Sequence, residues 1–147
     1  MTLPDALLHF FDDYCAAFNA LDGTAVAALY ALPSALAQGE QFAHWHERDA
    51  IVANMTTLCA YYREHGFRTA RYLITGALPQ GPNHAVVDIA WQIERNAGLP
   101  TWTFRTGYNM VRTPDGWRIR LCTAYEEANL HVGWQPVTNY DADLENA

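Results

Sequence analysis

Four side chains in this sequence are suited to moving a proton or to holding a developing negative charge: Tyr14, His44, His46 and Tyr108. A tyrosine hydroxyl can donate a hydrogen bond to a substrate oxygen, and an imidazole can exchange protons near neutral pH. His44 and His46 are two positions apart, so on an extended chain they project to the same face. These four residues are the candidate catalytic groups, with a tyrosine as the electrophile and a histidine as the proton carrier.

A metal site at the histidine pair would need a third ligand, and the sequence places none at a suitable spacing from His44 and His46. The pair also fits a simpler interpretation, as two solvent-facing side chains at the end of a strand. We therefore expect no bound metal, and no cofactor.

The three cysteines, Cys15, Cys59 and Cys122, lie far apart in the sequence and have apolar neighbours. An odd number without close spacing predicts neither a disulfide framework nor a zinc site, so we expect buried thiols in a reducing compartment. Residues 1–10 lack a basic run followed by a long apolar stretch, and no window approaches about 18 uninterrupted apolar residues. We therefore expect no membrane span and a cytoplasmic location.

The composition predicts one domain with a well-filled core. The chain has 147 residues, of which 50% are apolar and 13% aromatic, and its formal net charge is -7. Nucleic acids and anionic membranes bind basic surfaces, so neither is expected as a partner. We expect the domain to cover residues 1–127 and a polar tail to cover residues 128–147.

Apolar periodicity predicts three helices in the first half of the chain. Leu7, Phe11, Tyr14 and Phe18 recur at spacings of four, three and four, which places them on one helical face. Residues 24–32 are expected to form a second, shorter helix that Pro33 ends. One or two short strands follow within residues 36–45, and a third helix is expected over residues 47–65.

The second half of the chain changes to a period of two, which is typical of strands. Four strands are expected over residues 67–78, 85–95, 101–113 and 117–125. The segments that join them are short and contain Pro, Gly, Asn and Asp, so consecutive strands should pair as antiparallel hairpins. Helices followed by antiparallel strands predict an α+β fold with the helices on one face of the sheet.

Each of the last three strands has one apolar face, which we expect to point towards the helices. In residues 85–95 this face comprises Val87, Ile89, Trp91 and Ile93. In residues 101–113 it comprises Trp102, Phe104, Tyr108 and Met110. In the last strand it comprises Trp117, Ile119, Leu121, Thr123 and Tyr125.

Specific stretches of the sequence carry a resemblance to a known family. Residues 14–22 read Tyr-Cys-Ala-Ala-Phe-Asn-Ala-Leu-Asp and precede Ala-Leu-Tyr at 28–30, and residues 115–119, Asp-Gly-Trp-Arg-Ile, enter the last strand. Together with the order of elements, residues 5–127 resemble the nuclear transport factor 2-like superfamily, whose bacterial members include SnoaL-like cyclases and ketosteroid isomerases. The resemblance implies a cone. Its three N-terminal helices pack on a curved antiparallel sheet of four long strands plus one or two short ones, and a ligand occupies its open end.

The resemblance also bears on two kinds of chemistry. A ketosteroid isomerase needs a carboxylate base, an oxyanion tyrosine and a protonated acid. Tyr14 falls at the position of that tyrosine, but Gln38 stands near the base and Tyr108 near the acid, so this isomerase activity is not expected. The epoxide hydrolases of the superfamily need an Asp-Arg-Asp set inside the pocket, whereas Asp88 and Arg105 belong to the outward-facing sets of their strands.

The expected ligand pocket is aromatic, with a few hydroxyl groups. Its predicted lining comprises Tyr14, Phe18, Gln38, Trp91, Phe104, Thr106, Tyr108, Leu121, Thr123 and Tyr125. Buried tyrosine hydroxyls need hydrogen-bond partners, which are either each other or a ligand oxygen. We therefore expect a small apolar or oxygenated molecule as the partner of this pocket.

Three functions stay open on the sequence alone, and it does not decide whether the protein is an enzyme. The first is a SnoaL-like domain that binds such a molecule. The second is a lyase, isomerase or cyclase that acts on it through tyrosine and histidine. The third is a non-catalytic dimeric interaction domain with a filled core.

The outward face of the predicted sheet mixes charges of both signs. It carries Arg105, Arg118 and Arg120 together with Asp88, Gln92 and Glu94. Mixed charges suit a self-complementary contact about a two-fold axis, so we expect a homodimer formed through this face.

Overall fold

The structure, a computed structural model, describes residues 3–125 of the chain. Two helices come first, followed by two short strands, a third helix and four long strands. This order agrees with the α+β arrangement expected from the periodicity. The expected tail at residues 128–147 lies outside the described residues.

Helix α1 (Asp5–Asn19) buries the face that the apolar spacing predicts. Leu7, Phe11, Tyr14 and Phe18 are all buried, whereas Asp12 and Asp13 are exposed. The helix therefore packs one continuous apolar stripe into the core and leaves its charged side in solvent.

Helix α2 (Gly23–Ala28) is shorter than the predicted segment at residues 24–32. Asp22 caps its first turn by accepting a hydrogen bond from the backbone N–H of Ala25 at 3.0 Å. Strand β1 (Tyr30–Gln38) begins two residues later, because Tyr30 pairs with Ile119 of the last strand and the N–H of Ile119 donates to the carbonyl of Leu29. A contact distant in sequence overrides local helix propensity here, so the predicted helical end was wrong.

Helix α3 (Arg48–Glu64) lies within one residue of the prediction at each end. Its buried residues are Ile51, Asn54, Met55, Cys59 and Tyr62. Gly66 follows with a φ of 82°, a conformation that glycine adopts without steric cost, and it turns the chain into the next strand.

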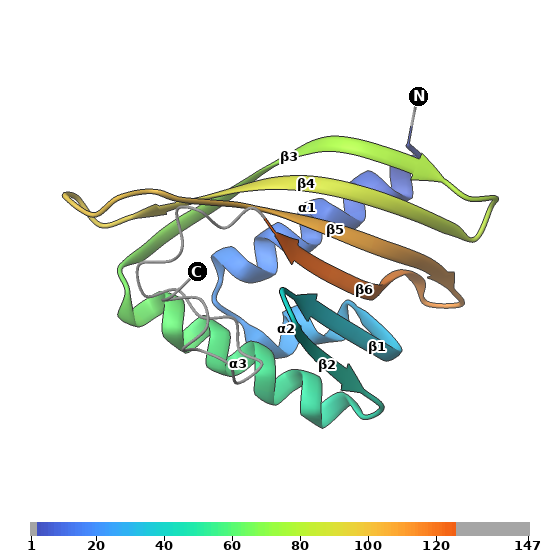
Figure 1. The fold of residues 1–147 in the computed structure, drawn as a ribbon, viewed down its shortest axis with the longest axis horizontal. Helices are drawn as coiled ribbons and strands as arrows, with labels where there is room; N and C mark the ends of the chain where they lie inside the picture. The colour runs from blue at the N-terminus through green and yellow to red at the C-terminus, as the bar shows by residue number, and fades with distance from the viewer. Residues whose placement is uncertain (1–2, 126–147) are drawn as a thin grey trace.

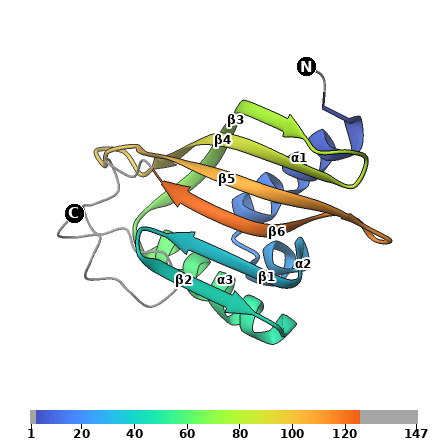
Figure 2. The ribbon, with the colours of Figure 1, turned by 45° about the vertical axis from the view of Figure 1, so that its right-hand side comes forward.

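Six strands form a single open sheet in the order β2-β1-β6-β5-β4-β3. The remaining strands are β2 (Gln41–Trp45), β3 (Phe67–Pro79), β4 (His84–Arg95), β5 (Trp102–Thr113) and β6 (Gly116–Tyr125). Strand β1 runs parallel to β6, and all other neighbours are antiparallel, so the sheet is mixed. Figure 1 shows the long strands arching over α1, with α2 and α3 on the same concave side, and Figure 2 shows the same layers after a turn of the molecule.

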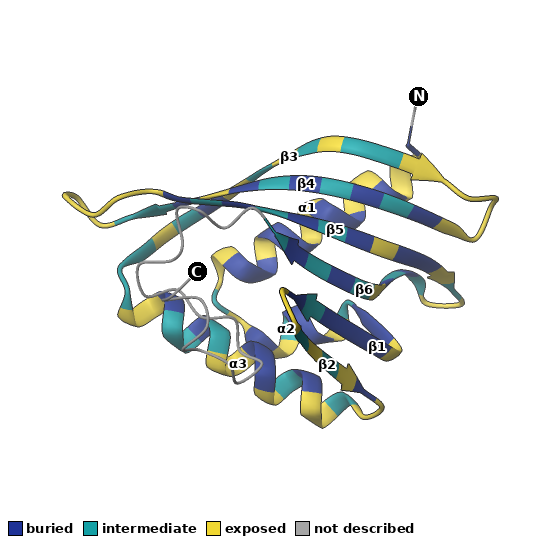
Figure 3. Cartoon of the chain, in the orientation of Figure 1, coloured by how far each residue is buried: buried dark blue, intermediate teal, exposed yellow. Residues whose placement is uncertain are grey.

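The four long strands begin and end within one residue of their predicted bounds, and their antiparallel pairing is confirmed. The predicted inner faces of β4 and β5 are also correct. Val87, Ile89 and Ile93 of β4 are almost completely buried, as are Trp102 and Met110 of β5. Figure 3 shows buried residues alternating with less buried ones along most of β4 and β5.

The predicted inner face of β6 is wrong beyond Ile119. Asn109 of β5 pairs with Leu121 and Met110 pairs with Ile119, so Arg120 is an extra residue with no partner across the ladder. Such a bulge reverses the alternation of side chains that follow it. Cys122 and Ala124 consequently face the helices and are buried.

The bulge turns three predicted inner residues, Leu121, Thr123 and Tyr125, to the outer face of the sheet. Each of them is only partly buried. They therefore take no part in the core between the sheet and the helices.

Within residues 3–125, no helix combines the length and the apolar character needed to cross a membrane.

Candidate ligand-binding cavity

Helices α1 and α3 and the concave face of the sheet enclose a cavity of about 60 Å³ that is partly open to the outside. This space could hold roughly four water molecules or a comparable part of a small ligand. Its lining is mostly aromatic and aliphatic. The lining residues that carry polar groups are Tyr14, Tyr30, Gln38, Asn54, Tyr62, Trp91, Thr106, Tyr108 and Cys122.

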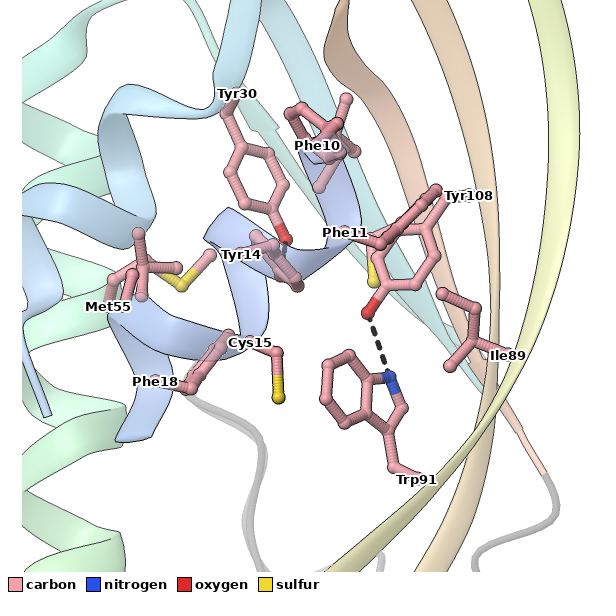
Figure 4. Packing of buried hydrophobic residues seen from close by; sticks show 14 of the residues in the cluster. Phe10, Phe11, Tyr14, Cys15, Phe18, Tyr30, Met55, Ile89, Trp91 and Tyr108 are labelled. Atoms are coloured by element: carbon pink, nitrogen blue, oxygen red, sulfur yellow. Dashed lines mark hydrogen bonds between the residues drawn. The ribbon is translucent and has the colours of Figure 1, made fainter. Parts of the chain in front are cut away.

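Two tyrosines meet in this cavity from different elements. The hydroxyl oxygens of Tyr14 on α1 and Tyr30 at the start of β1 lie 2.8 Å apart, and both residues are almost completely buried. Figure 4 shows the two rings converging between α1 and the sheet. The guanidinium of Arg48 donates to the carbonyls of Ala27 and Tyr30 at 2.6 and 2.7 Å, which holds the backbone that carries Tyr30.

A third tyrosine approaches from the sheet. The indole N–H of Trp91 on β4 donates to the hydroxyl oxygens of Thr106 and Tyr108 on β5, at 2.9 and 3.1 Å. The bond to Tyr108 is drawn in Figure 4. Because an indole only donates, the hydroxyl of Tyr108 acts as an acceptor in this bond and keeps its own proton for another oxygen.

The three tyrosines stay protonated over the physiological pH range. Burial raises the pKa of Tyr14, Tyr30 and Tyr108 well above the ordinary value of tyrosine, since a phenolate would lose its hydration. The hydroxyls can therefore donate hydrogen bonds to a neutral oxygen but cannot serve as bases. Among the described residues that line the cavity, none carries a carboxylate or an imidazole.

The histidine pair does not face this cavity. His44 lies opposite Ala35 in the β1–β2 ladder, on the outer face of the edge strand, and both His44 and His46 are exposed. Their rings are 4.3 Å apart, so they do share one side of the chain. The pairing of β2 with β1 directs them to solvent, away from the described lining of the cavity, so their role as proton carriers for a pocket ligand stays a prediction.

The other predicted lining residues divide into two groups. Those that border the cavity are Tyr14, Phe18, Gln38, Trp91, Phe104, Thr106 and Tyr108, whereas the bulge at Arg120 excludes Leu121, Thr123 and Tyr125. That the first group binds a ligand stays a prediction.

Tyr125 instead joins a polar cluster on the outer face of the sheet. Its hydroxyl donates to Asp88, which also accepts from Thr75 at 2.7 Å and pairs with Arg105 at 2.5 Å. Asp88 and Arg105 therefore face outward, as predicted, and form no acid-base set inside the cone. Burial by itself raises the pKa of Asp88, but the hydrogen bonds from Tyr125, Arg105 and Thr75, with the charge of Arg105, outweigh it and lower the pKa.

Sequence reasoning missed several residues that line the cavity. Tyr30 lies within the segment predicted as a helix, and Cys122 and Ala124 alternate with the residues of the last strand that were expected to face the helices. Asn54 could have been found, because it is the polar residue within the apolar stripe of its helix. No group of three or more metal-ligating side chains occurs within residues 3–125.

Comparison with models of protein families identifies a family that the sequence matches. Residues 5–127 match the model of a family described as NTF2-like protein (DUF6841). The chain belongs to this family, which confirms the resemblance drawn from the sequence. No curated protein matches the chain.

Solved structures with similar folds support the architecture. A domain of unknown function with a cystatin-like fold from Nostoc punctiforme superposes with a TM-score of 0.68 at 17% identity, covering 86% of this chain and 78% of that one. An NTF-2 like protein of unknown function from Shewanella oneidensis superposes with a TM-score of 0.62 at 19% identity, covering 82% of this chain and 96% of that one. A ketosteroid isomerase-like protein from Erwinia carotovora superposes with a TM-score of 0.63 at 17% identity, covering 82% of this chain and 92% of that one. At these identities the likeness concerns the fold alone.

Proposed function

We propose that the protein binds a small, uncharged and mostly apolar molecule that carries one or two oxygen atoms in the cavity between α1, α3 and the sheet. The observation that supports this most strongly is the convergence of three protonated tyrosine hydroxyls in an apolar enclosure. Such groups orient a neutral oxygen by hydrogen bonding, and the apolar walls supply most of the affinity.

Binding is favoured over turnover by the same geometry. Proton transfer would need a group that gains and loses a proton near neutral pH within reach of the ligand. The candidates for that role, His44 and His46, lie on the outer side of the sheet edge. The described lining instead offers hydroxyl, amide, indole and thiol groups.

A thermal-shift screen against small neutral molecules that carry an oxygen atom tests this function. A ligand present at about 100 times its dissociation constant stabilises the folded state by about 2.7 kcal/mol. We expect some ligands to raise the midpoint temperature of unfolding of the wild-type protein. The same ligands should raise the midpoint temperature of Tyr14→Phe by a smaller amount. A library that shifts neither protein would contradict the proposal.

We also propose that the protein forms a homodimer through the outer face of its sheet. Leu73 and Leu78 of β3 are exposed on this face, by 67% and 54%. The same face carries paired charges, among them Arg71 with Glu94 at 3.2 Å and Arg105 with Asp88. An apolar strip beside charges of both signs suits contact with a second copy of the same face.

A further inference from the structure

The polar side chain of Asn54 occupies an apolar position. The residue lies in the middle of α3, on the face that packs into the core beside Ile51, Met55 and Tyr62, and it is only 9% exposed. Its side chain borders the cavity. An aliphatic residue is the usual occupant of such a buried helical position, so the amide calls for a physical explanation.

The side-chain amide of Asn54 uses little of its hydrogen-bonding capacity. Within residues 3–125, its one hydrogen-bond partner is the thioether sulfur of Met55, at 3.9 Å from Nδ2. A thioether is a weak acceptor, and a side-chain amide has two N–H donors and a carbonyl acceptor to satisfy. A buried amide in this condition lowers the stability of the folded protein unless another molecule satisfies it.

Asn19, at the end of α1, shows how this protein treats a structural asparagine. Its Oδ1 accepts from the backbone N–H of Ala70 at 2.6 Å and from the hydroxyl of Thr69 at 3.2 Å. Its Nδ2 donates to the carbonyl of Ala70 at 3.1 Å. Asn19 thus binds strand β3 through both the oxygen and the nitrogen of its amide, whereas the amide of Asn54 has only a thioether partner within residues 3–125.

We propose that Asn54 selects the ligand, and that the ligand carries a neutral carboxamide or lactam group. This inference rests on the proposed function of the cavity. The amide of Asn54 presents a donor and an acceptor side by side, and another amide is the neutral group that pairs with both at once. A simple ketone or ether satisfies only the donor.

The remaining lining of the cavity fits such a ligand. The hydroxyls of Tyr14 and Tyr108 border the same space and can donate to a second oxygen, and Gln38 adds a buried amide from β1. No Asp, Glu, Lys, Arg or His lies among the described lining residues, so an ionised ligand would lose its hydration without an opposite charge to replace it. The ligand is therefore neutral, with apolar bulk against Phe18 and Phe104.

Three probes of nearly the same size and shape test the inference: benzamide, acetophenone and α-methylstyrene. They offer, in turn, a donor with an acceptor, an acceptor alone, and neither. Dissociation constants would be measured by calorimetric titration for the wild-type protein and for Asn54→Leu, a variant of similar volume. We expect the wild type to bind benzamide about tenfold more tightly than acetophenone, a difference of one well-made hydrogen bond to the amide.

In Asn54→Leu this preference should disappear, while acetophenone and α-methylstyrene bind as well as before or better. The inference is overturned if the variant keeps the preference, or if the wild type binds benzamide no more tightly than acetophenone. In either case binding of acetophenone leaves the proposed function standing. Absence of binding by all three probes to the wild type overturns the inference and counts against the proposed function.

Thermal denaturation without a ligand provides a second readout, with Asn19→Leu as the matched control. Because the proposal gives the amide of Asn54 a role in ligand binding and none in the fold, Asn54→Leu should have a midpoint temperature of unfolding equal to or above that of the wild type. Asn19→Leu should lower the midpoint, because it removes three hydrogen bonds between α1 and β3. A midpoint for Asn54→Leu as low as that of Asn19→Leu would assign Asn54 a structural role and overturn the inference.

Discussion

The hydroxyl oxygens of Tyr14 and Tyr30 lie 2.8 Å apart inside the cavity, although one residue belongs to a helix and the other opens the parallel strand of the sheet. Each of the two residues is at most 2% exposed. Because two hydroxyls in such surroundings have few other partners, their contact couples α1 to β1 beside the cavity.

A double-mutant cycle on this pair should show the coupling. Tyr14→Phe and Tyr30→Phe are each expected to lower the free energy of unfolding by about 1 kcal/mol, since each leaves a buried hydroxyl without this partner. The double variant should lose less than the sum, with a coupling energy of about 1 kcal/mol. Urea denaturation of the four proteins provides the measurement, and strictly additive losses would show that the two hydroxyls act independently.

The polar cluster around Asp88 on the outer face of the sheet predicts a specific dependence of stability on pH. The pKa of Asp88 is lowered in the folded protein, so its carboxylate contributes stability above the unfolded value of about 3.9 and loses it as the pH falls through the folded pKa. Asp88→Asn should therefore cost about 1 kcal/mol at pH 7 and little at pH 2. Unfolding free energies at the two pH values would be compared with those of Asp115→Asn, an exposed aspartate in a turn. An equal loss for Asp88→Asn at both pH values would refute the role of its charge.

The approach of α2 to α3 predicts an unusual response to alanine. A Cβ atom on Gly23 would lie 2.6 Å from the backbone N and Cα of Thr56, which are not free to move away. Gly23→Ala should therefore destabilise the protein by about 2 kcal/mol through overpacking, although alanine has the higher helix propensity. Gly107→Ala is the control, since the backbone of Gly107 is outside the left-handed region and the nearest atom to an added Cβ would be 3.8 Å away, an ordinary van der Waals distance. A Gly23→Ala protein as stable as the wild type would contradict this packing.

The proposed dimer predicts that one exposed leucine controls the oligomeric state. Leu73→Glu places a charge on the outer face of β3, where the side chain is 67% exposed, so the fold should be unaffected while self-association weakens at least tenfold. Sedimentation velocity of the variant, with Leu8→Glu on the helical side as the control, provides the measurement. A wild-type protein that sediments as a monomer, or an unchanged dimer in Leu73→Glu, would contradict the proposal.

The parts of this fold that local patterns determine could be predicted from the sequence. The alternation from Val87 to Ile93 is uninterrupted, so it identified the inner face of β4, and Trp91 with it. In α1, the spacing of Tyr14 and Phe18 was sufficient to place both in the core. In each case neighbouring residues in one element carry the whole signal.

The parts that were missed depend on pairing between distant segments. The bulge at Arg120 is visible only where β6 meets β5, yet it decides that Cys122 rather than Leu121 borders the cavity. The orientation of His44 follows from its place opposite Ala35 in a short edge ladder. Tyr30 became a strand residue because it pairs with Ile119, far along the chain.

The most direct test of the central claim is the ¹⁵N NMR signal of the Trp91 indole N–H, which lies inside the cavity and donates to Thr106 and Tyr108. Its resonance is identified as the one absent from Trp91→Phe. Titration with acetophenone should shift this signal in the wild-type protein. In Ala124→Leu, whose larger side chain fills the same cavity, the shift should be lost while the rest of the spectrum keeps its dispersion. An unperturbed Trp91 signal in the wild type, or an equal shift in Ala124→Leu, would contradict binding in this cavity.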